Sequence, residues 1–552
     1  MKETNKKYAL QAIAVFLVIT VAVLVTMDQT LPPRALPASA PATQFSAERA
    51  IEHIKVIAQE PRLVGQPGFE VARDYVIGKL TELGLTTEVQ KTAGVENVLG
   101  KLAGTASQDA ILLVAHLDST AYGPGASDDA SGVAVLLETA RALQAGAPLR
   151  NSVILLFTAP EETGYQGAQA FISEHPWLKD VKLVINFDTG GLSGPSELTN
   201  LSYPSGWLVR HLARADPYVF ASSDYGEGDS DFIPFKIAGY SGYAFDYARD
   251  RRKHGPSDNI ENLNPPSIQH QGYHALSLAR YFGNLDSLGD SEEPDPIFFT
   301  VLRLGLIYYP KGWVMPITLV CTLVLVGTVA LGFRRKCLTL PGVGLGALVF
   351  AVSVVTAPLV VRLLWAVLSS TVPAYQVRYY GHAANEPLLL GLFASLAIAV
   401  TSTWYALLQV VRKVRLPDLI MGALALLFMV MIYYSFTAPE SSFRLTWSLL
   451  FASLAAGYLF HSTKTEGEAL TAIQILGFLV AAIAAITLLL PGIYMGFTGS
   501  EIDDLFMPMV VLVVLVGLLV PPLHIITRPG RWWLPVVAAL LTAVLLIVAV
   551  LG

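Results

Sequence analysis

Charged residues are scarce in this chain. Only 14% of the 552 residues are Asp, Glu, Lys or Arg, whereas typical soluble domains carry about 25%. Apolar residues make up 53%, and the mean hydropathy is +0.52, which excludes a disordered chain and a single soluble globule. The shortage is uneven, because 55 of the 80 charged residues lie in 28–307. We therefore expect a water-soluble part joined to a membrane part.

Cysteine and positive charge are also lacking in the soluble part. The two cysteines, Cys321 and Cys337, both lie outside 28–307, which excludes a disulfide-stapled secreted domain. Segment 28–307 contains 21 Lys and Arg against 34 Asp and Glu, a net charge of −13. Nucleic-acid binding needs clustered positive charge to neutralise phosphates, so we expect no nucleic acid partner.

An uncharged run at 8–27 is long enough to cross a bilayer. Lys2, Lys6 and Lys7 precede it, which predicts a cytoplasmic N-terminus and export of the segment after residue 27. A signal peptide cleaved near Ala38–Ala40 is the alternative, but the length of the run favours an uncleaved anchor over 1–27. The proline-containing segment 28–44 is then a linker.

The region 308–552 is predicted to be a membrane domain of about eight transmembrane helices. Apolar spans recur near 308–333, 340–368, 387–411, 417–437, 444–462, 469–490, 505–526 and 532–551. Every second loop is basic, and these loops together contain Arg334, Arg335, Lys336, Arg412, Lys413, Arg415, Lys464, Arg528 and Arg531. The only basic residues in the loops between them are Arg378 and Arg444, and these loops also contain Glu386, Glu440, Glu501, Asp503 and Asp504. By the positive-inside rule, the basic loops are cytoplasmic, and the C-terminus and soluble domain are outside.

Segment 45–300 shows alternating helix and strand patterns. Ser46 is a predicted N-cap, and helices are expected over 68–83 and 131–144. Four β-rich runs are expected at 97–104, 111–119, 152–162 and 183–191. Continuous apolar strands that alternate with helices predict an α/β fold, a mixed sheet flanked by helices on both faces.

Polar side chains follow the apolar runs at the points where the predicted strands end. They are His116 and Asp118, then Asp128 in a Gly-rich turn, Glu161 and Glu162, Asp188, and finally His254 in a loop. Open α/β sheets bind ligands beyond the carboxyl ends of their strands. Two histidines with several carboxylates and no cysteine suit a divalent metal, with zinc the first choice.

Five segments in this order give a specific resemblance: HLD, GASDDASGVA, APEETG, NFDTGG and RKHGPSDNIEN. Over roughly 46–285 the chain resembles metallopeptidase family 28, whose members are di-zinc exopeptidases. With the added membrane half, it is similar to the branch of endoplasmic reticulum metallopeptidase and vacuolar membrane protease. Five motifs in register are far more specific than an isolated Glu-Glu or His-x-Asp.

The resemblance implies a role for each motif residue. Asp128 matches the carboxylate that bridges two Zn²⁺ ions; His116 and Asp188 complete one site, and Glu162 and His254 the other. Glu161 matches the general base, and Asp118 the carboxylate that orients His116. Asp129 is expected to cap a helix rather than to bind metal.

Two positions depart from the family pattern. The segment Ser230-Asp231-Phe232 lacks the His that many members have, and Lys253 stands where Tyr is frequent. Neither change removes a metal ligand, but both bear on the substrate pocket. His270 and His274, four apart on a predicted helix, could chelate metal, although a helix face is the favoured interpretation.

The sequence thus predicts a membrane-anchored zinc exopeptidase, with aminopeptidase activity on peptides the first choice. Alternatives are a carboxypeptidase or dipeptidase, a glutaminyl-cyclase-like enzyme on the same fold, and a receptor or scaffold without catalysis. The expected location is the cell membrane, with the peptidase domain periplasmic or extracellular. An endoplasmic reticulum or vacuolar membrane with a luminal domain is the alternative.

Overall fold

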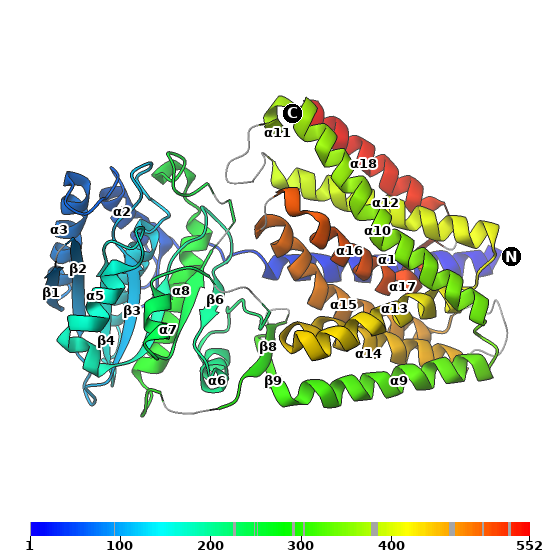
Figure 1. The fold of residues 1–552 in the computed structure, drawn as a ribbon, viewed down its shortest axis with the longest axis horizontal. Helices are drawn as coiled ribbons and strands as arrows, with labels where there is room; N and C mark the ends of the chain where they lie inside the picture. Colours follow the sequence, from blue (N-terminus) through cyan, green and yellow to red (C-terminus); the bar gives the residue numbers. More distant parts are fainter. Residues whose placement is uncertain are drawn as a thin grey trace. The chain divides into compact units, whose positions relative to one another are not determined.

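The computed structural model describes residues 2–551 except 93, 225–227, 248, 251, 290–292, 302–303, 377–384, 463–469, 500–501 and 528–531. The chain divides into two compact units, which are coloured by sequence in Figure 1. One contains Thr30–Lys311, and the other contains Met1–Gln29 together with Gly312–Gly552. Of the loop residues used to predict topology, Arg378, Lys464, Arg528 and Arg531 lie outside the described residues.

The unit 30–311 is built on a seven-stranded mixed sheet with the order β1-β2-β4-β3-β5-β7-β6 (Figure 1). The strands are β1 (Thr86–Thr92), β2 (Val95–Leu102), β3 (Ala110–His116), β4 (Ser152–Thr158), β5 (Val181–Phe187), β6 (Glu197–Leu201) and β7 (Gly242–Asp246). The central strands β4, β3, β5 and β7 run parallel, and β1, β2 and β6 are antiparallel to their neighbours. The carboxyl ends of the four central strands therefore lie at one edge of the sheet.

Helices cover both faces of this sheet, which confirms the predicted fold class. They are α2 (Ala47–Ile57), α3 (Pro67–Glu82), α4 (Ala130–Gln144), α5 (Gln166–Glu174), α6 (Gly206–Ala215), α7 (Phe232–Ile237) and α8 (Pro265–Gly283). On β3, Ile111 and Leu113 belong to the buried cluster that also contains residues of α2, α3, α4, α6 and α8, whereas Leu112 belongs to the cluster that contains residues of α5 and α7. This alternation is the two-residue period of a strand buried on both faces.

Segment 30–46, which includes most of the predicted linker, is hydrogen-bonded to other parts of the unit 30–311. The Leu36 N–H donates to Gln269 Oε1 at 2.8 Å, and the Arg249 guanidinium donates to Thr30 O at 2.7 Å. Ser46 caps α2 as predicted, by accepting from the Arg49 N–H.

Residues 296–310 form an unpredicted hairpin, β8 (Pro296–Thr300) and β9 (Leu306–Pro310), so the helix expected from 308 begins only at Val314.

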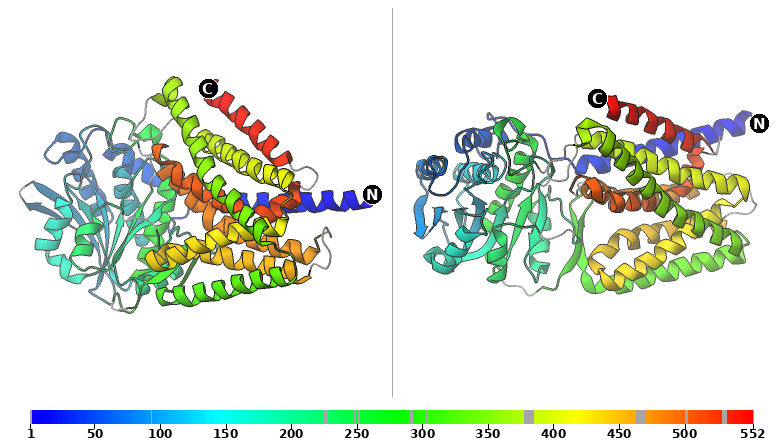
Figure 2. Two further views of the ribbon diagram at one scale, coloured as in Figure 1. Left: turned by 45° about the vertical axis from the view of Figure 1, so that its right-hand side comes forward. Right: turned by 45° about the horizontal axis from the view of Figure 1, so that its top comes forward.

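The second unit consists of helices. They are α1 (Lys2–Gln29), α9 (Val314–Arg334), α10 (Leu340–Thr371), α11 (Pro373–Gln376), α12 (Glu386–Val411), α13 (Leu416–Thr437), α14 (Pro439–Ser462), α15 (Ala472–Gly499), α16 (Phe506–Leu518), α17 (Val520–Thr527) and α18 (Trp533–Leu551). Among the described residues, eight helices are long and apolar enough to cross a membrane. A ninth span results if α16 and α17 form one crossing. Figure 2 shows these helices from two further sides.

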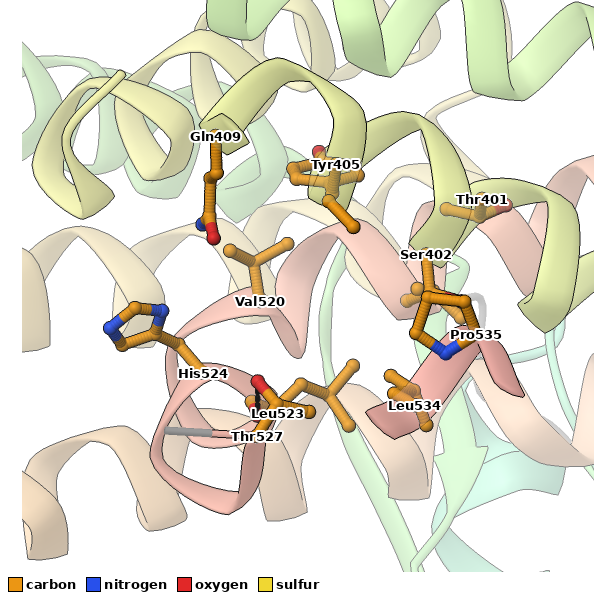
Figure 3. A pocket seen from close by; sticks show the side chains of 12 residues that line it. Thr401, Ser402, Tyr405, Gln409, Val520, Leu523, His524, Thr527, Leu534 and Pro535 are labelled. Carbon is orange, nitrogen blue, oxygen red and sulfur yellow. Dashed lines mark hydrogen bonds between the residues drawn. The ribbon is translucent and has the colours of Figure 1, made fainter. Parts of the chain in front are cut away.

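The predicted span 505–526 is broken, because α16 and α17 meet at 65°. Val520, Leu523 and His524 of α17 line a cavity of about 60 Å³ whose other wall includes Tyr405 and Gln409 of α12 (Figure 3). A bent helix within a membrane unit is tolerated where its backbone lies against protein or a cavity.

Candidate metal centre

The carboxyl edge of the parallel strands gathers the predicted site residues. His116 is the last residue of β3, and Asp188 directly follows β5. Glu161 and Glu162 lie in the turn after β4, and Asp128 lies in the turn before α4. The loop after β7 contributes His254. Residues spread over 139 positions of sequence therefore meet because parallel strands end together.

Asp128 lies between the two histidines. Its Oδ1 is 3.2 Å from His116 Nε2, and its Oδ2 is 2.8 Å from His254 Nε2. Asp128 is 2% exposed, so this shared carboxylate is screened from bulk water. The arrangement suits an anion that bridges two cations, each approached by one imidazole.

A further carboxylate stands beside each histidine. Asp188 Oδ1 lies 3.7 Å from His116 Nε2, and Glu162 Oε2 lies 3.4 Å from His254 Nε2. Donor atoms of His116, Asp128 and Glu162 fall within 4.8 Å of one another, as do those of His116, Asp129 and Asp188. The structure thus brings all five expected ligand residues together.

Asp129 has the expected capping role and a second contact. Its Oδ1 accepts the Gly132 N–H at 2.8 Å at the start of α4, and its Oδ2 accepts the His116 N–H at 3.2 Å. The same side chain therefore fixes the helix that follows Asp128 and the end of strand β3.

The carboxylate of Asp118 holds the Glu161–Glu162 turn. Its Oδ1 accepts the Glu161 N–H at 2.9 Å, and its Oδ2 accepts the Glu162 N–H at 3.3 Å. His116 Nδ1 is 3.1 Å from the backbone carbonyl of Asp118 and 3.6 Å from its carboxylate. Asp118 therefore orients His116 mainly through its backbone and the two glutamates through its side chain.

Glu161 faces the cluster. Its Oε2 is 4.0 Å from His116 Nε2, and its side chain is 12% exposed. A carboxylate at this place is near the metal ligands while remaining reachable from solvent. Burial raises the pKa of Glu161 to about 10 and that of Glu162 to about 7 in the metal-free cluster.

Three residues that the sequence did not single out as site residues support the cluster. The fully buried Arg62 donates to the carbonyls of Leu117 at 2.7 Å and Gly125 at 3.0 Å. Asp258 accepts the N–H groups of Ser127 at 2.5 Å and Asp128 at 3.1 Å, and Gln271 donates to Asp188 O at 2.7 Å. Asp258 lies in the motif RKHGPSDNIEN, whereas Arg62 and Gln271 lie in none of the five motifs.

His270 and His274 lie on one face of helix α8, which is the interpretation that the sequence favoured, and their ring nitrogens are hydrogen-bonded to protein groups. Both are buried in α8. His270 Nδ1 accepts the Ser196 N–H at 3.0 Å, and His274 is hydrogen-bonded to Asp216 and, at 3.1 Å, to Ser196 O. They hold the segment before β6 against α8.

The two departures from the family pattern lie at the site. Asp231 is 1% exposed and accepts from the Thr158 hydroxyl at the end of β4. Lys253 Nζ lies 3.1 Å from Asp128 Oδ2. Burial alone would lower the pKa of Lys253, but Asp128 and Asp188 hold it above its usual range.

The donor set fits a divalent metal. Imidazole nitrogens and carboxylate oxygens without thiols are typical zinc ligands. Glu162 Oε1 is buried and accepts no hydrogen bond from the described residues, which costs free energy unless a cation compensates it. These residues therefore suit zinc.

Residues 97–279 match the Peptidase family M28. The chain carries a peptidase family M28 domain. The match includes every residue of the cluster, from His116 to His254.

Two curated relatives are similar over part of the chain. Endoplasmic reticulum metallopeptidase 1 of Rattus norvegicus is 28% identical over 319 residues, which cover 49% of this chain and 34% of that protein. The vacuolar membrane protease of Candida dubliniensis is 31% identical over 215 residues, which cover 37% of this chain and 22% of that protein. The chain thus spans about a third or less of the length of these relatives.

Among solved structures, the aminopeptidase from Aneurinibacillus sp. strain AM-1 is similar, with 15% identity and a TM-score of 0.39. The similarity covers 46% of this chain and 98% of that one.

Proposed function

We propose that the unit 30–311 is a zinc-dependent aminopeptidase, anchored in a membrane by α1 and α9–α18 and acting on the extracytoplasmic side. The observation that supports the activity best is the placement of Asp128, whose two carboxylate oxygens each face a different histidine. In this proposal His116, Asp128 and Asp188 hold one zinc ion, and Asp128, Glu162 and His254 hold a second.

Bound zinc would supply Lewis acidity, by lowering the pKa of water and by polarising the scissile carbonyl. The residues of the chain supply positioning and proton transfer. Glu161 takes a proton from the attacking water and returns it to the nitrogen of the leaving peptide. Asp118 keeps Glu161 in place, because its carboxylate accepts the Glu161 N–H at 2.9 Å.

The charge of the site favours the N-terminal ammonium of a peptide over its C-terminal carboxylate. Nine carboxyl groups belong to the cluster and its surroundings, namely those of Asp118, Asp128, Asp129, Glu161, Glu162, Asp188, Asp231, Asp246 and Asp258. When zinc is bound and these groups are ionised, their charge would exceed that of Arg62, Lys253 and two zinc ions combined, whereas in the metal-free cluster burial keeps Glu161 protonated near neutral pH. The guanidinium of Arg62 is also committed to backbone carbonyls, so it does not offer a carboxylate site.

Three matched peptides test this proposal with the zinc-loaded full chain. We expect release of the first residue from a peptide with a free N-terminus and no release from its N-acetylated counterpart. Release of the last residue from the acetylated peptide would instead identify a carboxypeptidase. Ring closure of an N-terminal glutamine without hydrolysis would identify a cyclase. Absence of all three activities would contradict the proposal and favour a receptor or scaffold.

A further inference from the structure

The ammonium group of Lys253 lies inside the cluster of candidate metal-ligand side chains. Its Nζ donates to Thr189 O at 2.8 Å and lies 3.1 Å from Asp128 Oδ2, while the side chain as a whole is 26% exposed. The next residue, His254, approaches the same Oδ2 at 2.8 Å. One carboxylate oxygen is therefore shared by an imidazole and a fixed positive charge.

The contact of Lys253 with Asp128 is on one side of the carboxylate, at Oδ2. Oδ2 faces His254, whose Nε2 is 3.4 Å from Glu162, whereas Oδ1 faces His116, whose Nε2 is 3.7 Å from Asp188. The ion pair of Lys253 is on the Oδ2 side. A lysine amine is an ammonium at neutral pH, so it donates hydrogen bonds and offers no lone pair to a metal.

A positive charge beside one cation position opposes the second cation there, and it does so more strongly in a buried site than in water. The same charge stabilises Asp128 when that position is empty, because the carboxylate is buried and needs a counter-ion. Lys253 Nζ also donates a hydrogen bond to Thr189 O, in the loop that follows β5. This hydrogen bond holds the ammonium near the Asp128 carboxylate.

We infer that Lys253 makes the two metal positions unequal. It lowers the zinc affinity of the position formed by Asp128, Glu162 and His254 relative to that formed by His116, Asp128 and Asp188. It also serves as the counter-ion of Asp128 when only the tighter position is filled. This inference rests on the zinc binding in the proposed function. Lys253 is thus a positioning residue that acts through Asp128. Because the second position fills only at a higher zinc concentration, the zinc concentration regulates how many positions are occupied.

Zinc titration of the full chain in detergent tests the inference. After removal of metal, zinc is added in competition with a chromophoric chelator. The natural chain should show two affinity classes. Lys253→Gln should tighten the weaker class by about tenfold or more, an effect of the size found for residues that contact metal ligands. The tighter class should change less, because Lys253 contacts Asp128 Oδ2 directly and acts on Asp188 only through its charge. Lys182→Gln, which removes an exposed lysine of β5, should leave both classes unchanged.

Two additional measurements separate charge from folding. Lys253→Arg keeps the positive charge and should keep two classes. The metal-free Lys253→Gln protein should melt at a lower temperature than the metal-free natural chain. If the natural chain binds zinc and Lys253→Gln binds it identically, the inference alone is wrong. Equal classes in a folded Lys253→Arg variant would also contradict it. If the natural chain binds no zinc, the proposed function fails as well.

Discussion

At the scale of single residues, Asp118 shows how a carboxylate can act on chemistry without touching substrate. Its two oxygens accept the backbone N–H groups of Glu161 and Glu162, while its own carbonyl oxygen meets His116 Nδ1. It therefore links a proposed base, Glu161, with a ligand from each proposed metal position. The two segments that it joins follow β3 and β4, and no local sequence pattern connects these strand ends.

Asp118→Asn tests this link. The amide offers one acceptor oxygen, and its NH₂ group opposes one of the two backbone donors, so the Glu161–Glu162 turn should shift. We expect kcat/KM to fall by about 10- to 100-fold, with weaker zinc binding. Steady-state kinetics with a free N-terminal peptide and zinc competition measure both effects. Unchanged kinetics in the folded variant would show that the turn does not depend on Asp118.

Glu197 gives a prediction about pH. It is buried in β6, its Oε1 has no hydrogen-bond partner among the described residues, and burial raises its pKa to about 8. An acid whose folded pKa exceeds its unfolded value of about 4.3 costs stability when ionised. This cost grows as pH rises from the unfolded pKa to about 8.

Glu197→Gln should therefore raise the melting temperature of the metal-free chain much more at pH 9 than at pH 5. The exposed Glu174→Gln serves as the control and should shift both melting temperatures alike. Equal stabilisation by Glu197→Gln at the two pH values would mean that Glu197 is not held neutral in the folded protein.

The residues of the candidate metal site could be singled out because their types and their order along the chain are specific. Arg62 and Gln271 could not, since they act on backbone carbonyls, which any sequence supplies. For His270 and His274 the sequence favours a helix face, and the structure adds that this face of α8 is buried. Helical spacing places two residues on one side of a helix but does not report what packs against that side.

At the scale of elements, the four β-rich runs of the sequence correspond to β2, β3, β4 and β5, and the other strands were missed. β3 and β4 are buried along their whole length. β1, with the sequence TTEVQKT, is an edge strand whose residues are mostly exposed, and β6 and β7 have only five residues each. The break between α16 and α17 was missed because neither half contains a charged residue.

Helix α4 begins beside Asp128, so its cap bears on the site. Asp129→Ala removes the acceptor of the Gly132 N–H and should destabilise the first turn by about 1 kcal/mol. Hydrogen exchange of the amides in 130–133 should become about fivefold faster for such a loss. Asp74→Ala, which changes an exposed aspartate of α3, should leave this exchange unchanged. Equal protection after Asp129→Ala would show that the cap contributes no stability.

At the scale of the whole molecule, the uneven charge divides the chain into the same two kinds of structure that the fold shows. The acidic residues gather in the unit that holds the cluster, and the helices of the other unit are long and apolar. Which side of the membrane each loop faces rests on the positive-inside pattern of the sequence.

Labelling of cysteines in intact cells tests this topology. Asp286→Cys places a thiol at an exposed position of the peptidase unit, and Cys337 lies in a predicted cytoplasmic loop. In a Cys337→Ser background, Asp286→Cys should react with an impermeant maleimide from outside. In the natural chain, Cys337 should react only after the membrane is permeabilised. The opposite pattern would place the peptidase unit in the cytoplasm.

We propose that the cluster around Asp128 is a zinc peptidase site in which Glu161 is the base. The most direct measurement is kcat for a free N-terminal peptide with the natural chain, Glu161→Gln and the exposed control Glu174→Gln, at equal measured zinc content. We predict that Glu161→Gln lowers kcat by about 10²- to 10⁴-fold, as loss of a general base does, and that Glu174→Gln leaves kcat unchanged. Full activity of Glu161→Gln would contradict the account.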